Sequence, residues 1–310
     1  MAGAARAALL AAALALSACA TTPVARGGED RLCAPPHRAP LPAAGAPAPA
    51  DPATLGVLRA RGFSPRGLAA AQALGVTDLL HRVSAPEAAR RPLETLRDHL
   101  RLSDALLLAV LGVDAAIAHI ACERERGREL RARLQARLDQ QVRQAGLLGV
   151  AVGAVAAAAS GGLSLASLDT ASNIAGIVGG GIGAGLSAVP LFASAEGALR
   201  TPDNPLIEPW EGPRAPAVLP PAVWQHLNQT VDTDPSARAQ LLAAWRAPDI
   251  LGPQEDAASR ARAALLLGEG GLYTPDLLDT RDEMLAQLGA AIALMSRDLR
   301  VLLTEIAARR

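Results

Sequence analysis

His119, Cys122 and Glu123 are the residues whose types and spacing come closest to a reactive site. His119 and Cys122 lie three positions apart, so they share a face if this stretch is helical, and Glu123 follows directly. An imidazole beside a thiol can activate it as a nucleophile, and the three side chains together could ligate a metal ion. The alternative, which we favour, is that His119 and Cys122 lie in the buried seam of a helix.

No familiar catalytic motif accompanies this group. GxSxG, HExxH, CxxC and the EF-hand loop are all absent from the sequence. The other histidines are scattered without ligand spacing, at His37, His81, His99 and His226. We therefore predict that the protein is not an enzyme and has no catalytic residue, no metal site and no cofactor.

The glycine-rich tract Asn173–Phe192 could in principle cradle a phosphate. Gly183, Gly185 and Ala188 fit the spacing GxGxxA, but no β-type strand precedes them, and the whole chain lacks the lysine that a P-loop needs. Nucleotide binding is therefore not predicted. Two interpretations of the tract stay open: a membrane-inserted hairpin and a tight helix-packing surface.

Two uncharged segments around this tract favour the first interpretation. Residues 145–168 and 170–195 carry no charge, and either is long enough as a helix to span about 30 Å of hydrocarbon. Several glycines are spaced as GxxxG, which would let two helices approach closely or self-associate. These are Gly149, Gly153, Gly176, Gly179, Gly180, Gly181, Gly183 and Gly185.

Three features favour packing or self-association of the hairpin in water instead. The tip is rich in glycine, alanine and serine, so its transfer into lipid gains little. Asp169 separates the two segments and would be costly near the bilayer centre. Seven arginines between Arg124 and Arg143 precede the tip, and such flanks favour the cytoplasmic side.

The N-terminal residues are typical of an export signal. Arg6 is the only charge before the short apolar run Ala7–Leu16, which cannot span a bilayer as a mature helix. Leu16-Ser17-Ala18-Cys19 follows and resembles the lipobox of bacterial lipoproteins. The resemblance implies cleavage before Cys19, acylation of its thiol by chains such as palmitate, and export of the remainder. An ordinary secretory signal with a chance cysteine is the alternative.

The predicted location is the cell envelope, with membrane lipid bound through acylated Cys19. Ala20 rather than aspartate follows Cys19, which in enterobacterial lipoproteins implies the outer membrane, so we expect this membrane, facing the periplasm, over the inner one. Because an exported compartment permits disulfides, Cys33 and Cys122 could pair. Cys122 could equally be a small buried hydrophobe.

Stepwise changes in composition divide the chain. Proline-rich segments favour extended structure without a core, and one lies in the N-terminal tether and one in the middle of the chain. The predicted units are a signal peptide (1–18), a Pro/Ala-rich tether (19–53), short N-terminal helices (54–102), a long helical hairpin with an apolar glycine-rich tip (103–200), a Pro-rich crossing loop (201–221) and C-terminal helices (222–310).

The fold class that follows is all-α: an elongated helical bundle built on a long antiparallel hairpin with a Gly/Ala-rich tip, plus a long amphipathic C-terminal helix. Ser64 and Gly75 delimit one short helix, and Ser103 is expected to cap the first limb of the hairpin. Its apolar face should comprise Leu106, Val110, Val113, Ile117 and Ile120, and then Leu130, Leu134, Leu138 and Val142. We expect a reversal at Gly161-Gly162 and a second limb that returns to about Leu199.

The last helix, about Thr274–Ala308, shows the clearest pattern. Its apolar residues keep four–three spacing, as in a coiled-coil seam. They are Leu288, Ile292, Met295, Leu299, Leu302 and Ile306. Shorter helices are expected near 222–231, 235–245 and 253–267. The mixed run ERERGRELRAR, which begins at Glu123, is expected to form either a solvated helix face or a dock for anionic envelope material.

The net charge and the predicted location restrict the functions that we expect. Thirty basic and thirty acidic residues give a formal net charge of zero, so nucleic acid is not an expected partner. We predict a lipid-anchored envelope scaffold or interaction protein whose partners are membrane lipid, an envelope protein and possible further copies of itself. The alternatives are a glycine-zipper oligomer that inserts into membranes and, third, an enzyme without a recognisable motif.

Overall fold

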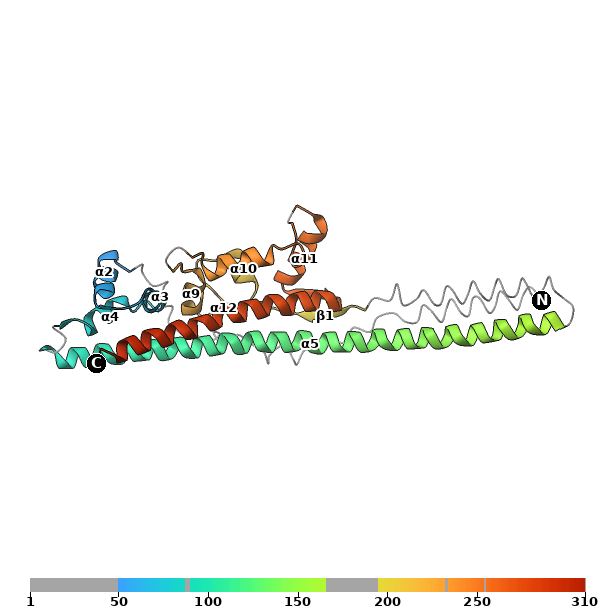
Figure 1. Ribbon diagram of the computed structural model, residues 1–310, viewed down its shortest axis with the longest axis horizontal. Coiled ribbons are helices and arrows are strands. Elements are labelled where there is room, and N and C mark those ends of the chain that lie inside the picture. The colour runs from blue at the N-terminus through green and yellow to red at the C-terminus, as the bar shows by residue number, and fades with distance from the viewer. Residues whose placement is uncertain (1–49, 87–89, 166–194, 232–233, 254, 310) are drawn as a thin grey trace.

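The computed structural model describes residues 50–86, 90–165, 195–231, 234–253 and 255–309, with backbone only for 145–165. Figure 1 shows a helical, elongated bundle, which confirms the predicted fold class. The helices are α2 (Pro52–Ala60), α3 (Pro65–Ala73), α4 (Thr77–Val83), α5 (Pro92–Leu165), α8 (Ile207–Glu211), α9 (Pro221–Asn228), α10 (Ala237–Trp245), α11 (Ala257–Leu267) and α12 (Pro275–Ala307); the strands are β1 (Gly197–Arg200) and β2 (Gly270–Tyr273).

Two long helices, α5 and α12, form the spine of the molecule (Figure 1). They run antiparallel, because Arg131 of α5 meets Asp279 near the start of α12, whereas Ile120 meets Gly289 further along. All six residues of the seam predicted for α12 are buried in the core, which confirms the four–three pattern. Thr274 caps α12 by accepting a hydrogen bond from the Leu277 amide.

The buried face of α5 differs from the predicted one. Leu106, Val113 and Ile120 are buried as expected, but Val110 is 37% exposed. Alanines fill the positions between, since Ala109 and Ala116 are buried instead. These alanines keep the four–three spacing between the larger buried residues, so the seam that contains them, and not Val110, faces the core.

Both ends expected for this limb were also wrong. The helix begins at Pro92, eleven residues before the expected cap Ser103, because proline at the first position needs no amide partner. It also passes through Gly161-Gly162, where a reversal was expected, and its described part ends at Leu165. Neighbouring alanines keep helix propensity high enough to carry two glycines. Beyond Leu134, α5 continues for about 45 Å past the contact with α12.

Short helices pack along one side of this spine (Figure 1). The Ser64 hydroxyl accepts a hydrogen bond from the Gly67 amide and so caps α3, and Gly75 follows the helix with a positive φ of 66°, both as predicted. The expected helices near 222–231, 235–245 and 253–267 correspond to α9, α10 and α11. The Pro-rich loop crosses α5, where Pro220 lies against Gly112.

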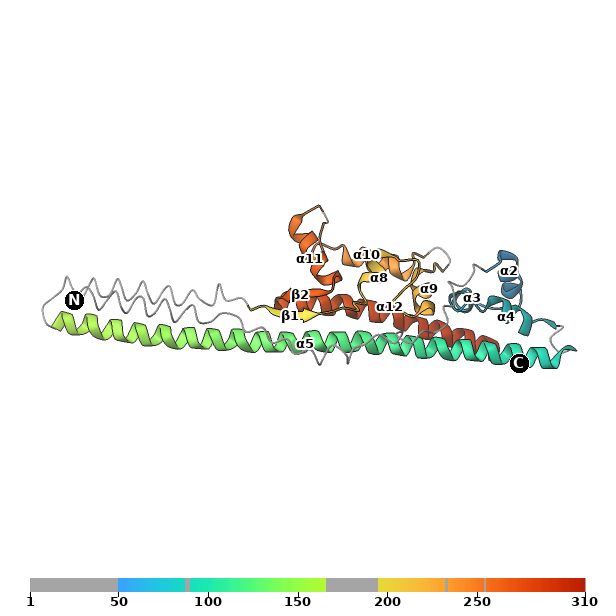
Figure 2. The same cartoon turned by 180° about the vertical axis from the view of Figure 1, so that it is seen from behind.

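A two-stranded antiparallel sheet was not predicted. Gly197 pairs with Tyr273 and Arg200 with Gly270, and Figure 2 shows both strands beside the start of α12. The second limb of the hairpin therefore does not reach Leu199 as a helix, because residues 197–200 are strand β1. The signal, most of the tether, Cys19, Cys33 and the tip glycines from Gly176 to Gly185 lie outside the described residues, as do the side-chain surroundings of Gly149 and Gly153.

Candidate functional site

The Glu123 carboxylate is the centre of a buried ion network between α5 and α12. Its Oε2 atom accepts a hydrogen bond from Arg281 Nη2 at 2.7 Å, and its Oε1 atom accepts one from Arg126 Nη1 at 2.8 Å. Arg126 also donates to the carbonyl of Arg200 at the end of β1. The network fastens the two long helices and the sheet together. Both carboxylate oxygens of Glu123 are paired within the network, although Nε of Arg281 is buried without a hydrogen-bond partner in the described structure, so we assign the network a structural role.

The arginine-rich run after Glu123 has one side that pairs with α12 and one exposed side. Arg124 donates two hydrogen bonds to the Asp282 carboxylate, at 2.8 and 3.0 Å, and Arg131 lies 2.7 Å from Asp279. Burial by itself would raise the pKa of Asp282, but the hydrogen bond from Arg124 and the charges of Arg124 and Arg128 outweigh it and lower this pKa. One side of the run thus holds α12, and the other, with Glu129 and Arg133, is a solvated helix face as expected.

The pair His119 and Cys122 does not form a reactive site. His119 is 5% exposed, and its Nε2 atom lies 3.2 Å from the carbonyl oxygen of Asp203 in the crossing loop. Cys122 is disulfide-bonded, which leaves no thiol for a nucleophile, and its partner lies outside the described residues. His119 belongs to the buried seam, as we had favoured.

An exposed apolar surface covers the side of α5 opposite to its buried seam. We name it the leucine face; it consists of Leu93, Leu96, Leu100, Leu107, Leu108 and Leu111, which are 80%, 57%, 58%, 59%, 62% and 55% exposed. Five of the six recur at intervals of three, four or seven residues, so they align along one side of the helix. Asp104 and Asp114 lie at the same spacing on this side and are exposed. No described segment of the chain covers these leucines.

The same part of α5 is apolar enough to cross a membrane. Within Pro92–Gln144 a window of 18 residues has a mean hydropathy of 2.2, and 33% of that window is buried inside the structure. It is the single helix with this property among the described residues. The buried share is the face that packs on α12, and the leucine face supplies much of the remainder.

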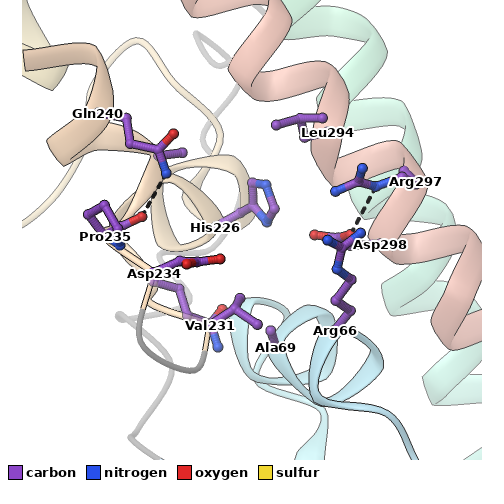
Figure 3. A pocket seen from close by; sticks show the side chains of 12 residues that line it. Arg66, Ala69, His226, Val231, Asp234, Pro235, Gln240, Leu294, Arg297 and Asp298 are labelled. Atoms are coloured by element: carbon purple, nitrogen blue, oxygen red, sulfur yellow. Dashed lines mark hydrogen bonds and ion pairs between the residues drawn. The ribbon is translucent and has the colours of Figure 1, made fainter. Parts of the chain in front are cut away.

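A small polar cavity lies where α3, α9, α10 and α12 meet (Figure 3). Its volume is about 190 Å³. Charged or titratable side chains approach it from every side: Arg66 from α3, His226 from α9, Asp234 from the segment before α10, and Arg297 and Asp298 from α12. This cavity could not be predicted from the sequence, because its lining comes from positions up to 232 residues apart that carry no common motif.

Two acceptors in the cavity lining are buried without a hydrogen-bond donor in the described structure. They are Oδ1 of Asp298, which is only 6% exposed, and Oε1 of Gln229. The nearest cation to Asp298 is its neighbour Arg297, whose Nε atom is 3.6 Å away, beyond hydrogen-bond distance. Burial lowers the pKa of His226, against an upward pull from the charge of Asp298, so this imidazole is neutral at pH 7.

A metal ion does not fit the cavity or any other described site. Nowhere in the described residues do three His, Cys, Asp or Glu side chains converge with ligand geometry. Comparison of the chain with protein-family models, curated proteins and solved structures found no match. Function must therefore be inferred from the leucine face, the cavity and the sequence signals themselves.

Proposed function

We propose that this protein is a lipid-anchored scaffold of the bacterial cell envelope that binds a helical partner protein on the leucine face of α5. The exposed leucine face is the observation that carries the proposal. Burying one exposed leucine side chain contributes about 1.5–3 kcal/mol, so a partner that covers most of the six would gain enough for stable binding. A soluble surface rarely leaves so long an apolar stripe uncovered.

The charges on this face favour a protein partner over lipid. Asp104 and Asp114 lie among the leucines and are exposed. Carboxylates are costly in hydrocarbon but can pair with basic side chains at the edge of a helix–helix interface. The partner chemistry we propose is an amphipathic helix with an apolar seam flanked by arginine or lysine at positions that meet these two aspartates.

The anchor rests on the lipobox Leu16-Ser17-Ala18-Cys19. A disulfide at Cys122 agrees with export, since disulfides persist in oxidising compartments outside the cytoplasm. An acylated Cys19 joined to the body through a proline-rich tether would hold α5 near the membrane. A scaffold with this design needs no catalytic site.

Photocrosslinking in living cells tests the proposal. A photoreactive amino acid replaces Leu107 on the leucine face or, as the matched control, Leu303 of α12, which is 44% exposed on a different surface. We expect an adduct from position 107 and none from position 303. Peptide mapping of the adduct should give an amphipathic helical segment with basic flanks, and Asp104→Arg should abolish the adduct.

Three results would contradict this function. An adduct with lipid would mean that the face lies on a membrane. An adduct with a second copy of the chain would make it a self-association surface. Equal adducts from positions 107 and 303 would show that the leucine face has no specific partner.

A further inference from the structure

We propose that the cavity between α3, α9, α10 and α12 binds a small ligand through a cationic nitrogen, an ammonium or guanidinium group, which Asp298 recognises. This site is separate from the leucine face. The cavity lies on the side of α12 where the short helices pack, and none of its lining residues belongs to α5 (Figures 1 and 3). The inference does not depend on the function proposed above.

The argument begins with the Asp298 carboxylate. It is 6% exposed, and its Oδ1 atom has no hydrogen-bond donor in the described structure. Removing a carboxylate from water without supplying donors is costly, and a buried charge is normally paired. The ion pair with Arg297 at 3.6 Å is too long to supply a hydrogen bond. A donor that enters the cavity would complete this group.

Other acceptors line the same cavity. Oε1 of Gln229 is buried without a donor in the described structure, while its Nε2 atom donates to Oε1 of Gln72 at 2.7 Å. Figure 3 shows the His226 ring and the Asp298 carboxylate facing the same space, and a neutral imidazole offers one acceptor nitrogen. The buried acceptors of the cavity therefore lack hydrogen-bond donors among the described residues. An ammonium group carries three and a guanidinium carries several.

Two cations define what else the ligand can carry. Arg66 and Arg297 line the cavity and are both exposed, so they lie at its solvent side. They would attract a carboxylate at the outer end of a ligand whose amine points inward. At about 190 Å³ the cavity is smaller than the sites that hold drug-sized ligands, so it suits a small amine or amino acid.

Ligand-observed NMR with a matched series of four-carbon probes tests the proposal on the full-length protein in detergent. The probes are butylamine, a cation; 2-aminobutyrate, a zwitterion; and butyrate, an anion. We expect saturation transfer from the protein to the first two and binding of butyrate that is weaker by about tenfold or more. Competition between butylamine and 2-aminobutyrate should show that they share one site.

Two variants locate the binding. Asp298→Asn keeps the side-chain shape but removes the charge, and it should weaken butylamine binding by about tenfold or more. Arg66→Ala removes an exposed cation, so it should weaken 2-aminobutyrate but leave butylamine equal or tighter. Circular dichroism melting curves confirm that each variant folds. A loss of binding that is confined to 2-aminobutyrate cannot come from misfolding of Arg66→Ala.

The proposal fails if butyrate binds as tightly as butylamine, because the arginines and not Asp298 would then define the site. It also fails if Asp298→Asn, still folded, binds butylamine as the parent does. Absence of transfer to any probe at about 10 mM would also overturn the proposal, because a site built for a small amine should bind it at or below this concentration.

Discussion

Arg281 of α12 places its Nη2 atom 2.7 Å from Oε2 of Glu123 on α5, and the two side chains are only 1% and 4% exposed. Their positions are 158 residues apart in the chain. A buried ion pair is costly to assemble because both charges leave water, but losing one partner strands the other. The pair therefore fixes the register in which the two long helices pack.

Replacing Glu123 by glutamine tests this role. Glu123→Gln leaves the Arg281 charge buried without a counter-ion, so the free energy of unfolding should fall by about 3 kcal/mol or more. Glu129→Gln is the control, because Glu129 pairs with Arg133 at 3.3 Å with both side chains more than half exposed. It should cost less than about 1 kcal/mol. Urea unfolding followed by circular dichroism measures both, and equal costs would contradict a special role for the buried pair.

Glu208 performs a different task, since it holds the Pro-rich crossing loop. Its buried carboxylate accepts hydrogen bonds from the backbone amides of Ala217, Val218 and Leu219, the last at 2.9 Å. Glu208→Gln turns an NH₂ group toward one of these donors, so we expect a loss of about 1.5–3 kcal/mol. Glu211→Gln, at an exposed position of the same short helix, should change stability by less than about 0.5 kcal/mol. Thermal unfolding distinguishes the two variants.

The contrast between α12 and α5 shows how far the sequence could predict the fold. In α12 every third or fourth residue is large and apolar, so one face alone can be buried. On α5 two apolar faces compete, and tertiary packing buries Ala109 rather than the more hydrophobic Val110. The leucine face is the second apolar face, which this packing leaves exposed.

Long-range polar contacts could not be predicted in the same way. The arginines after Glu123 resemble a solvated stretch because their partners Asp279 and Asp282 lie about 150 residues later. Strands β1 and β2 are four residues each and contain glycine, so they show no alternating pattern. The cavity with Asp298 forms only where α3, α9, α10 and α12 pack together, and no residue spacing in the sequence predicts this packing.

Gly270 tests whether the small sheet matters for stability. It has a φ of 99°, and a methyl group added there would collide with the carbonyl of Leu199 on the paired strand. Gly270→Ala should therefore destabilise the protein by more than about 1 kcal/mol. Gly127→Ala is the matched control in the interior of α5, where an added methyl group meets nothing. It should stabilise by up to about 1 kcal/mol. A stabilising effect of Gly270→Ala would contradict a requirement for glycine at this position of β2.

The ion pair between Arg124 and Asp282 predicts a pH dependence. The pKa of Asp282 is lower in the folded protein than in the unfolded chain, so its stabilising effect is complete above the unfolded value and disappears as the pH falls through the folded one. Asp282→Asn should cost about 1 kcal/mol at pH 7, and the difference from the parent should begin to shrink once the pH falls below the unfolded value of about 3.9 and disappear only below the lower folded pKa. Urea unfolding at pH 7, 5 and 3 measures this. A difference that grows in acid would overturn the assignment.

Cys19→Ala, exported by a conventional signal peptide, separates the lipid anchor from any anchor in the body. Acyl chains would supply the membrane affinity of the parent protein at about 0.8 kcal/mol per buried methylene. If the leucine face binds protein and the glycine-rich segments pack rather than insert, the variant should leave the membrane fraction under an alkaline wash while the parent stays. If it remains bound through the wash, an apolar part of the chain inserts by itself.

In that case the uncharged segments 145–168 and 170–195 become the first candidates, since each is long enough to span the hydrocarbon. Leu107→Asp in the same background then distinguishes the leucine face from those segments, because it should release the protein only if that face is the part that touches lipid.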